Sequence, residues 1–512
     1  MRIVVALAYL LASALSAPAA APPPHPHVYL VIVDGLDARL ADAAHMPRLF
    51  DVVAHEPAHS SVFAGAHAVM PARTNPNHVT LLTGAYADAH GVTGNVYWSR
   101  TRGAPPEMLE DAALIEVETL FTVAETTAPS LVTLGVVGKP KLARLFAAVP
   151  GRQHAPDVLW SPERLPPERR EAASGYSPDG ETIGAVLALA AEAEPDLVVM
   201  NLCDVDGAGH AHGPESAEYA RAVAAADTAI ARLLDDLHAR ARWDRSVVIV
   251  TADHGMSAVG PTPERPRPVI SLGPVLREAG VGGVTLVADG GVEHVYAERV
   301  ATRATTVGDA AETLGRVAAL ARTTPGVAEV LARLPVSGVP TLHAAHPGWH
   351  LDHPRTGELL LVAASGHQFV DPFNPGEANL RGNHGGPEDL AVPLVVTGGW
   401  TGLRAAPRGT PPPGAVDVAP TIAALLGLRA PRLLDGHPVP PGRAGHPIAA
   451  VLGNRPETLS RVGIDSERVT RFTGLTACRG RQKPARQTFR SVSAWLETTR
   501  AHRSARGRPK GL

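Results

Sequence analysis

The chain has 512 residues, of which 45% are hydrophobic and 19% are charged, so it can bury a large core as one domain with an insertion or as two domains. Its formal net charge of -3 excludes a strongly basic polyanion binder and a strongly acidic protein. The two cysteines, Cys203 and Cys478, are too few for a disulfide framework, and both thiols are predicted to be free.

The first residues are typical of an export signal. Arg2 precedes an apolar run over residues 3–15, and small residues follow at 17–19, so we expect a signal peptide of residues 1–21. The alternative is an uncleaved membrane anchor, but the run is shorter than the ~20 residues that a bilayer requires. Later stretches are not apolar enough to span a membrane. The sequence therefore predicts a secreted, extracytoplasmic protein.

Five apolar stretches follow along the chain, and each precedes a stretch with a helical pattern. Continuous runs of β-branched and other apolar residues are typical of parallel strands that helices cover on both faces. The predicted fold class is therefore α/β, with a doubly wound, mostly parallel sheet. The predicted strands cover residues 27–35, 131–138, 196–204, 246–255 and 390–399.

The stretch PARTNPNHVTLLTG, residues 71–84, predicts a helix after the first strand. Thr74 or Asn75 would be the N-cap, Pro76 would occupy the first helical position, and Gly84 would end the helix. Capping is the ordinary interpretation of Thr74, because capping threonines far outnumber catalytic ones.

The pattern of the chain changes between residues 260 and 380. A hairpin, a helix and a strand are predicted there, and we expect this segment to be a cap subdomain inserted into a catalytic domain of residues 25–259 and 381–451. Two helices belong to that domain, the second with Asp417 as its cap and Gly427 at its end. The elements cover residues 283–298, 306–326 and 357–364 in the insertion, and 218–241 and 417–427 outside it.

Residues 452–512 form a basic tail without strand pattern. We expect it to be solvated and mostly disordered rather than a polyanion-binding arm. A specific nucleic-acid partner is therefore not predicted.

Six carboxylate and imidazole side chains follow the predicted strands or lie in a glycine-rich loop. Ligands collect at the carboxyl ends of strands in open α/β sheets. Taken singly, such residues more often cap helices or hold structural positions than bind metals. Together, they could hold two divalent cations about 4 Å apart, which clamp the oxygens of an in-line displacement. The six residues are Asp34, Asp206, His210, Asp253, His254 and His384.

Thr74 then has a second possible role. Metal coordination and the positive end of the helix would favour its alkoxide and would also receive an anionic group. Nearby, AHGVTGN ends at Asn95, whose amide could donate a hydrogen bond to a phosphoryl oxygen. Alternatively, Asn95 is only a turn residue after Gly94.

Five motifs resemble, in order, those of the alkaline phosphatase superfamily and its nucleotide pyrophosphatase/phosphodiesterase branch. The resemblance covers residues 27–450 and is carried by VIVDGL, TNPNHVTLLTG with AHGVTGN, DVDGAGHAHGP, TADHGM and GNHGG. It implies a hydrolase with two divalent ions, most simply Zn²⁺, that acts on a small phosphodiester such as a nucleotide, and the predicted export signal makes this hydrolase a secreted one. The expected mechanism is two displacements through a phosphothreonine, with retention at phosphorus.

The resemblance also implies a role for each site residue. Thr74 would be the nucleophile, and Asn95 would bind the phosphoryl oxygen. One zinc ion would be held by Asp206, His210 and His384. The second would be held by Asp34, Asp253 and His254, with Thr74 reaching it. Oligomeric state stays open.

Two lysines depart from the phosphodiesterase pattern. Lys139 and Lys141, in VVGKPKLARLF, resemble instead the phosphonoacetate hydrolase branch. Two cations there would favour a phosphonate or a phosphomonoester, which carries more negative charge than a diester. Alternatively, both lysines lie in the first turns of a solvated helix.

Two other functions would place different demands on the sequence than hydrolysis of phosphate esters. A sulfatase would require a modifiable cysteine or serine where Thr74 stands, and neither cysteine lies in such a context. A catalytically silent, metal-stabilised binding protein would be expected to have lost the nucleophile or part of the ligand set.

Overall fold

The computed structural model describes residues 25–452, apart from 104, 267, 301–305 and 371–377. The predicted signal peptide, the basic tail from residue 453 and Cys478 lie outside the described residues. All described residues belong to one compact unit, Met1–Ile464. Cys203 is free and buried, as predicted. Within the described part of the chain, no helix combines the length and apolarity needed to cross a bilayer.

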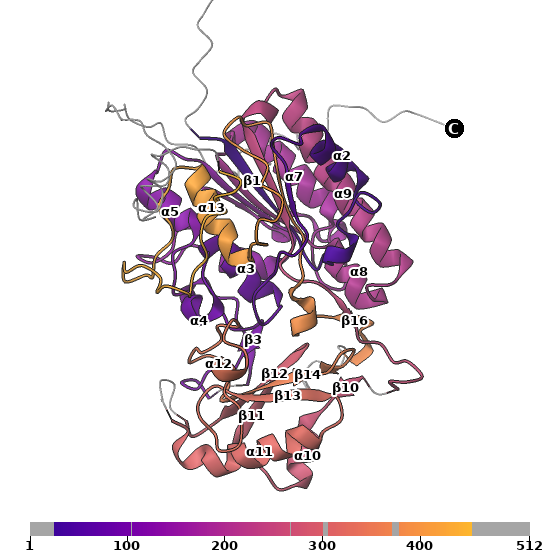
Figure 1. Cartoon of the computed structure of the whole chain (residues 1–512), viewed down its shortest axis with the longest axis vertical. Coiled ribbons are helices and arrows are strands. Elements are labelled where there is room, and N and C mark those ends of the chain that lie inside the picture. Colours follow the sequence, from indigo (N-terminus) through magenta and orange to yellow (C-terminus); the bar gives the residue numbers. More distant parts are fainter. Residues whose placement is uncertain (1–24, 104, 267, 301–305, 371–377, 453–512) are drawn as a thin grey trace, which may run out of the picture. The chain divides into compact units, whose positions relative to one another are not determined.

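The central feature is a seven-stranded sheet with β1 (His27–Val33) between two parallel neighbours (Figure 1). Val28 lies opposite Leu197 of β7 and Val247 of β8. The predicted α/β class with a mostly parallel sheet is therefore confirmed. The sheet order is β2 (Ser61–Phe63), β17 (Leu394–Thr397), β8 (Ser246–Thr251), β1, β7 (Leu197–Leu202), β5 (Thr133–Val137) and β6 (Val158–Trp160).

The prediction of a parallel strand within residues 390–399 is wrong in direction. β17 runs antiparallel to β8, with Leu394 opposite Thr251. All four of its residues are buried, so its apolar run looks like that of a parallel strand. An apolar run indicates that both faces of a strand are buried, but it does not indicate the direction in which the strand runs.

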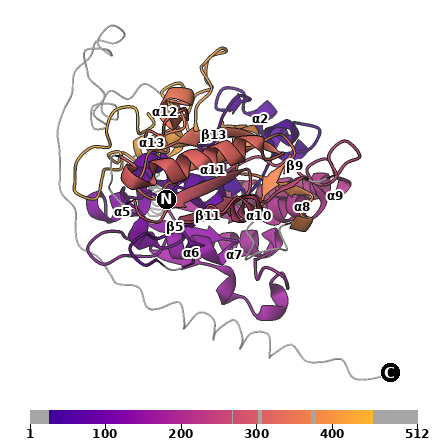
Figure 2. The same cartoon turned by 90° about the horizontal axis from the view of Figure 1, so that it is seen from below.

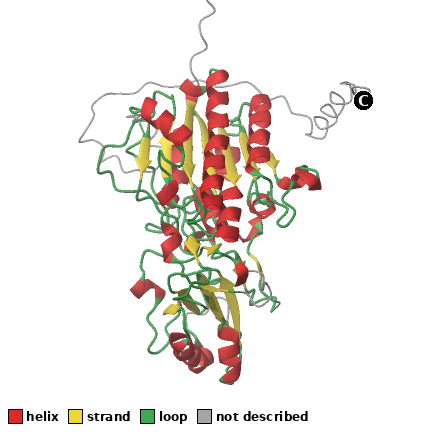
Figure 3. Ribbon diagram, turned by 90° about the vertical axis from the view of Figure 1, so that its right-hand side faces the viewer, coloured by secondary structure: helices red, strands yellow, loops and turns green. Residues whose placement is uncertain are grey.

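Helices cover both faces of this sheet (Figures 1 and 3). Val28, Leu30 and Ile32 of β1 pack on one side, whereas Tyr29 and Val31 pack on the other, because side chains alternate along a strand. One side holds α3 (Thr74–Thr83), α5 (Leu120–Thr127), α6 (Pro140–Leu145) and α13 (Val418–Leu425). The other holds α2 (Pro47–His55), α7 (Asp179–Ala193) and α9 (Ala217–Ala239).

The ends of two predicted helices can be compared with the capping residues that the sequence predicts. In α9, the Ser216 hydroxyl accepts a hydrogen bond from Tyr219 N at 3.1 Å, which is the expected N-cap arrangement. Asp417 is the N-cap residue of α13, as predicted, but its carboxylate makes no hydrogen bond to that helix. It accepts from Gly414 N and His446 N instead. Gly427 has the positive φ of 67° expected past a helix end.

Residues 260–380 contain a second sheet, and helices α10 (Leu272–Glu278) and α11 (Ala311–Thr323) pack on one of its faces (Figure 2). The other face packs with Met70 and Ala87 from outside the segment. The predicted hairpin, helix and strand are present, whereas the division at 260 and 380 stays a prediction. The sheet order is β11 (Val284–Asp289), β12 (Val292–Ala297), β14 (Leu359–Ala363) and β13 (Val327–Ala332).

The remaining elements are short. The helices are α4 (Ala87–His90), α8 (Asp204–His212) and α12 (Leu342–Ala345). The strand pairs are β3 (Val96–Tyr97) with β4 (Glu107–Met108), β9 (Ser257–Ala258) with β16 (Gly382–Asn383), and β10 (Val269–Ile270) with β15 (Gln368–Phe369).

Candidate active site

Three neighbouring strands deliver carboxylates to one edge of the large sheet. Asp34 directly follows β1, Asp206 lies in α8 after β7, and Asp253 follows β8. Because β7, β1 and β8 are parallel and adjacent, their carboxyl ends meet at the same edge. All three carboxylates are buried. The convergence that the sequence predicted is therefore present.

The first group of ligand atoms surrounds Asp206 Oδ1. His210 Nε2 lies 3.3 Å from this oxygen, because residues four apart share one face of α8. His384 Nε2, from the loop after β16, lies 3.6 Å from it. Two ligands of a tetrahedral zinc ion with bonds of ~2.0–2.1 Å are separated by about 3.3 Å. Both nitrogens therefore lie close to that separation from the Asp206 oxygen.

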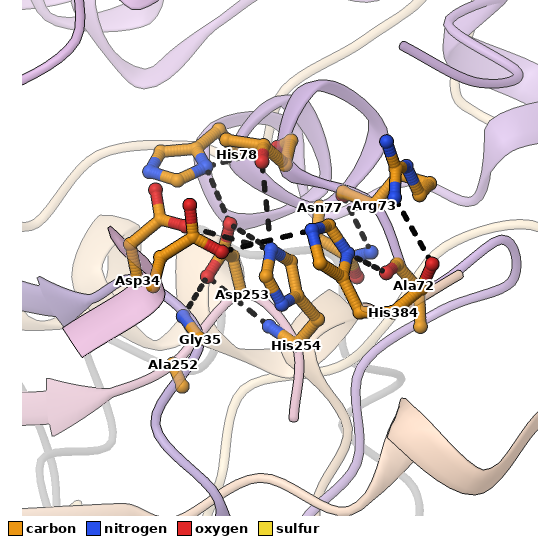
Figure 4. Close-up of polar contacts among 12 residues, drawn as sticks. Asp34, Gly35, Ala72, Arg73, Asn77, His78, Ala252, Asp253, His254 and His384 are labelled. Carbon is orange, nitrogen blue, oxygen red and sulfur yellow. Dashed lines mark hydrogen bonds and ion pairs between the residues drawn. The ribbon is translucent and has the colours of Figure 1, made fainter. Parts of the chain in front are cut away.

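The second group surrounds His254 Nε2 (Figure 4). Asp253 Oδ2 lies 3.3 Å from this nitrogen and Asp34 Oδ1 lies 3.4 Å from it. Thr74 Oγ1 also lies 3.4 Å from it. Two carboxylate oxygens and the threonine hydroxyl therefore each lie near the ligand-to-ligand separation from this nitrogen.

Three histidines present their Nε2 atoms to the carboxylates because their Nδ1 atoms are engaged elsewhere. Nδ1 of His210, His254 and His384 lies 3.0, 2.9 and 2.8 Å from the carbonyl oxygens of Gly382, Gly255 and Ala72, respectively. A carbonyl only accepts, so each Nδ1 carries the hydrogen and each Nε2 lone pair is free for a metal.

The charge of the cluster also fits divalent cations. Two buried carboxylate oxygens, Asp206 Oδ1 and Asp253 Oδ2, have no hydrogen-bond donor among the described residues. Burial opposes protonation of His254, but Asp253 and Asp34 outweigh it and raise the pKa of this imidazole. Burial and the neighbouring His254 ring lower the pKa of His384 well below its ordinary value, so this ligand is neutral. The donor set therefore suits two metal ions.

His78 is a site residue that the sequence analysis missed. Atoms of Asp34, His78 and Asp253 lie within 4.8 Å of one another, as do atoms of Asp206, His254 and His384. His78 Nδ1 lies 2.9 Å from Thr74 O and 3.3 Å from Asp253 Oδ2 (Figure 4). The signal was its position four residues after Thr74, on the same face of α3.

Thr74 is the first residue of α3 and does not cap it. The N-cap is Arg73, and no side chain of the cap residue bonds to the helix. The capping interpretation of Thr74 is therefore wrong, and its buried hydroxyl faces His254 instead. Gly84 ends the helix with a φ of 67°, as predicted.

Asn95 supplies the cap that Thr74 does not. Its Oδ1 accepts a hydrogen bond of 2.8 Å from Asn75 N in the first turn of α3. Because a backbone N–H requires an acceptor, this bond assigns the oxygen and leaves Nδ2 as the free donor of the amide. Asn95 is therefore more than a turn residue.

Lys139 is buried between the two groups of ligands. Its ammonium nitrogen lies 2.7 Å from Asp34 Oδ1 and 2.6 Å from Asp206 Oδ2, so the solvated-helix interpretation is wrong for this residue. Burial opposes the charge of Lys139, but Asp206 and Asp34 raise its pKa well above the ordinary value. Burial likewise opposes ionisation of Asp206, yet Lys139 holds the pKa of that carboxyl well below its ordinary range.

Lys141 differs from Lys139. Its side chain is half-buried and makes no ion pair with another described residue. Burial and the Lys139 ammonium lower its pKa to about 8. The two lysines therefore do not form one anion-binding pair.

A small cavity adjoins the site. It lies beside His384, between residues 383–389 and residues 363–367 of the inserted segment. Its walls therefore combine a candidate ligand loop with the segment whose sequence carries no recognisable motif.

Known proteins resemble this chain in sequence over much of its length. The sequence pattern of the family described as type I phosphodiesterase / nucleotide pyrophosphatase matches residues 28–387. The human ectonucleotide pyrophosphatase/phosphodiesterase family member 7 is 28% identical over 259 residues, which are 50% of this chain and 53% of that protein. The mouse family member 1 is 26% identical over 189 residues, 36% of this chain and 19% of that protein. The chain thus spans about half the length, or less, of these relatives.

Two solved structures resemble the fold. An inactive variant of murine ectonucleotide pyrophosphatase/phosphodiesterase 5 in complex with AMP has a TM-score of 0.60 at 19% identity and covers 79% of this chain and 96% of its own. Phosphonoacetate hydrolase from Sinorhizobium meliloti in complex with phosphonoformate has a TM-score of 0.56 at 20% identity. The match covers 79% of this chain and 96% of the hydrolase chain. At these identities, the likeness establishes the fold alone.

Proposed function

Because the chain belongs to the type I phosphodiesterase / nucleotide pyrophosphatase family, we propose that it is a hydrolase of small phosphodiesters, such as nucleotides, with two divalent metal ions. The resemblance stated from five ordered motifs is thereby confirmed at the level of the family. One observation carries the proposal: the buried Thr74 hydroxyl lies 3.4 Å from His254 Nε2, among the proposed metal ligands and at the start of α3.

The ligand sets follow the two groups of atoms described above. Asp206, His210 and His384 would hold one ion, and Asp34, Asp253, His254 and Thr74 would hold the other. When bound, divalent ions such as Zn²⁺ stabilise negative charge on the reacting oxygens and lower the pKa of a coordinated hydroxyl.

The chain's own residues would then carry out two displacements. Thr74 Oγ gives up its proton to solvent and attacks phosphorus, a Thr–O–P bond forms, and the P–O bond to the leaving group breaks, so that the leaving oxygen departs with its electron pair and takes up a proton from solvent. Asn95 Nδ2 and the N-terminus of α3 stabilise charge on the phosphoryl oxygens. Water then attacks the same phosphorus, and the Thr74 oxygen leaves. Two inversions give net retention.

We also propose that the protein acts outside the cytoplasm. The support is the apolar N-terminal segment with its small residues at 17–19, which is typical of an export signal. Fusion of residues 1–24 to a reporter that is active only after export tests this proposal.

A second candidate is hydrolysis of a phosphonate or a phosphomonoester. It is favoured by Lys141, whose ammonium has no ion-pair partner among the described residues and could meet an additional negative charge. Lys139 is less suited to this role because two carboxylates already engage it.

The experiment that tests the proposed function measures turnover of a chromogenic phosphodiester before and after metal removal. A hydrolase should lose turnover in EDTA and regain it with zinc. A silent binding protein would show no turnover in either state, although its melting temperature would still rise with zinc.

A further inference from the structure

Asp289, from the inserted segment, lies among the loops of the candidate active site. It is the last residue of β11, and its side chain is fully buried. Its Oδ1 lies 2.7 Å from Arg73 Nε, and its Oδ2 accepts a hydrogen bond of 2.8 Å from Asn95 N. One carboxylate therefore contacts the residue before the proposed nucleophile and the residue proposed to bind the phosphoryl oxygen.

Arg73 also contacts the loop that carries the candidate metal ligand His384 (Figure 4). Its Nη1 donates to Asn383 Oδ1 at 3.1 Å and to His384 O at 3.0 Å. The guanidinium is almost entirely buried, so the carboxylate of Asp289 supplies the charge that it needs. Three loops, at residues 73–74, 94–95 and 383–384, thus meet at one ion pair.

The backbone comes close to the ion pair at two glycines. Gly291 N donates to His384 O at 3.0 Å. A Cβ added at Gly290 would lie 2.1 Å from His384 O, and one added at Gly94 would lie 2.5 Å from Asp289 Oδ2. The turn after β11 therefore packs directly against the ligand loop, and glycine permits this approach.

We propose that Asp289 is a positioning residue for the hydrolysis proposed above, on which this inference rests. Its carboxylate holds the Thr74 hydroxyl and the Asn95 amide at the separation that transfer of a phosphoryl group requires. A misplacement of about 1 Å in such a pair can lower a rate ~100-fold. The inserted segment is then part of the catalytic machinery and more than a wall of the substrate site.

The competing explanation is that this ion pair only stabilises the fold, as many buried pairs do. Glu358 offers a matched control. It is also a buried carboxylate of the inserted segment, and it pairs with Arg333 at 2.9 Å and with Arg100. Neither arginine belongs to the loops of the active site. Loss of its charge should weaken the same segment without moving Thr74 or Asn95.

The test compares Asp289→Asn with Glu358→Gln in the zinc-loaded, full-length protein, using a chromogenic phosphodiester. We expect kcat of Asp289→Asn to fall at least about 100-fold with KM changed less than about threefold and with metal content unchanged. Glu358→Gln should lower the melting temperature by a similar amount and leave kcat within about threefold. Equal effects of the two changes on kcat, or loss of metal from Asp289→Asn, would overturn the inference.

A second variant covers the case in which Asp289→Asn does not fold. Gly94→Ala keeps both charges but forces its Cβ against Asp289 Oδ2, and it should reduce kcat with little change in KM. Unchanged kcat in this variant contradicts the positioning role. Absence of turnover in the wild type, by contrast, would contradict the proposed function itself.

Discussion

The ammonium nitrogen of Lys139 lies 2.6 Å from one oxygen of Asp206, Oδ2, whereas the Nε2 atoms of His210 and His384 lie 3.3 and 3.6 Å from the other, Oδ1. This contact leaves Asp206 Oδ1 to face His210 and His384. A lysine that the sequence analysis connected with substrate recognition is therefore placed to orient a metal ligand.

Replacement of Lys139 by methionine should lower turnover of diester, monoester and phosphonate substrates by similar factors. The physical reason is that two buried carboxylates, Asp34 and Asp206, lose their shared cation, and breaking a buried pair in this way costs about 3–5 kcal/mol. The measurement combines specificity constants with zinc competition against a chelator. A selective loss of phosphonate or monoester turnover would show that Lys139 recognises substrate instead.

Lys141 provides the complementary test. If its ammonium binds an extra substrate charge, Lys141→Ala should reduce monoester or phosphonate turnover far more than diester turnover. This preference should fade in the wild type as pH rises through about 8, because the ammonium is then lost. A uniform effect on all three substrate classes, at every pH, would exclude the second candidate function.

Two roles of Asn95, as the cap of α3 and as a hydrogen-bond donor, can be separated by mutation. Asn95→Asp keeps an oxygen acceptor for Asn75 N but removes the Nδ2 donor, so kcat should fall about 100-fold or more while stability is retained. Asn95→Ala removes both, and should also lose about 1 kcal/mol of unfolding free energy. Thermal or urea unfolding beside kcat separates the two roles. Similar kcat in Asn95→Asp and wild type would remove the amide from the mechanism.

The buried His90 should make the protein less stable in acid. It is buried, its Nδ1 accepts from Val92 N, and burial is the main cause that lowers its pKa to about 3. The unfolded chain binds the proton more tightly, so the contribution of His90 is fully present above about pH 6.5 and is lost as pH falls toward 3. The unfolding free energy should drop by about 2 kcal/mol between pH 7.5 and pH 5 from this residue alone.

The measurement for His90 is urea unfolding at both pH values. In His90→Gln, the difference between the two pH values should shrink by about that amount. An unchanged difference would contradict the assignment. His294, whose pKa is lowered to about 4 by burial, contributes with the same sign and remains in the variant.

The sequence was sufficient to predict the long strands and the convergence of ligands after them. Long apolar runs indicate buried strands, and adjacent parallel strands have their carboxyl ends at the same edge of a sheet. The sequence alone therefore predicted that Asp34, Asp206 and Asp253 lie close together. Strand direction could not be predicted in the same way, because β17 is as apolar as its parallel neighbours.

The residues that the sequence did not reveal act through contacts between distant segments. Asp289 and Arg73 are separated by more than two hundred positions, and no spacing rule connects them. Lys139 precedes a proline in a sequence typical of an exposed helix start, and only the packing of α6 places its ammonium between two carboxylates. In the sequence, Asn95 looks like a turn residue, because the helix that it caps begins about twenty positions earlier in the chain.

The most direct test of the account is to quench the zinc-loaded enzyme in acid during turnover of a chromogenic phosphodiester and to analyse its peptides by mass spectrometry. We predict phosphate on Thr74, in the peptide that contains residues 71–84, and neither label nor turnover in Thr74→Ala. Turnover in Thr74→Ala, or phosphate bound to a different residue, would contradict the central claim.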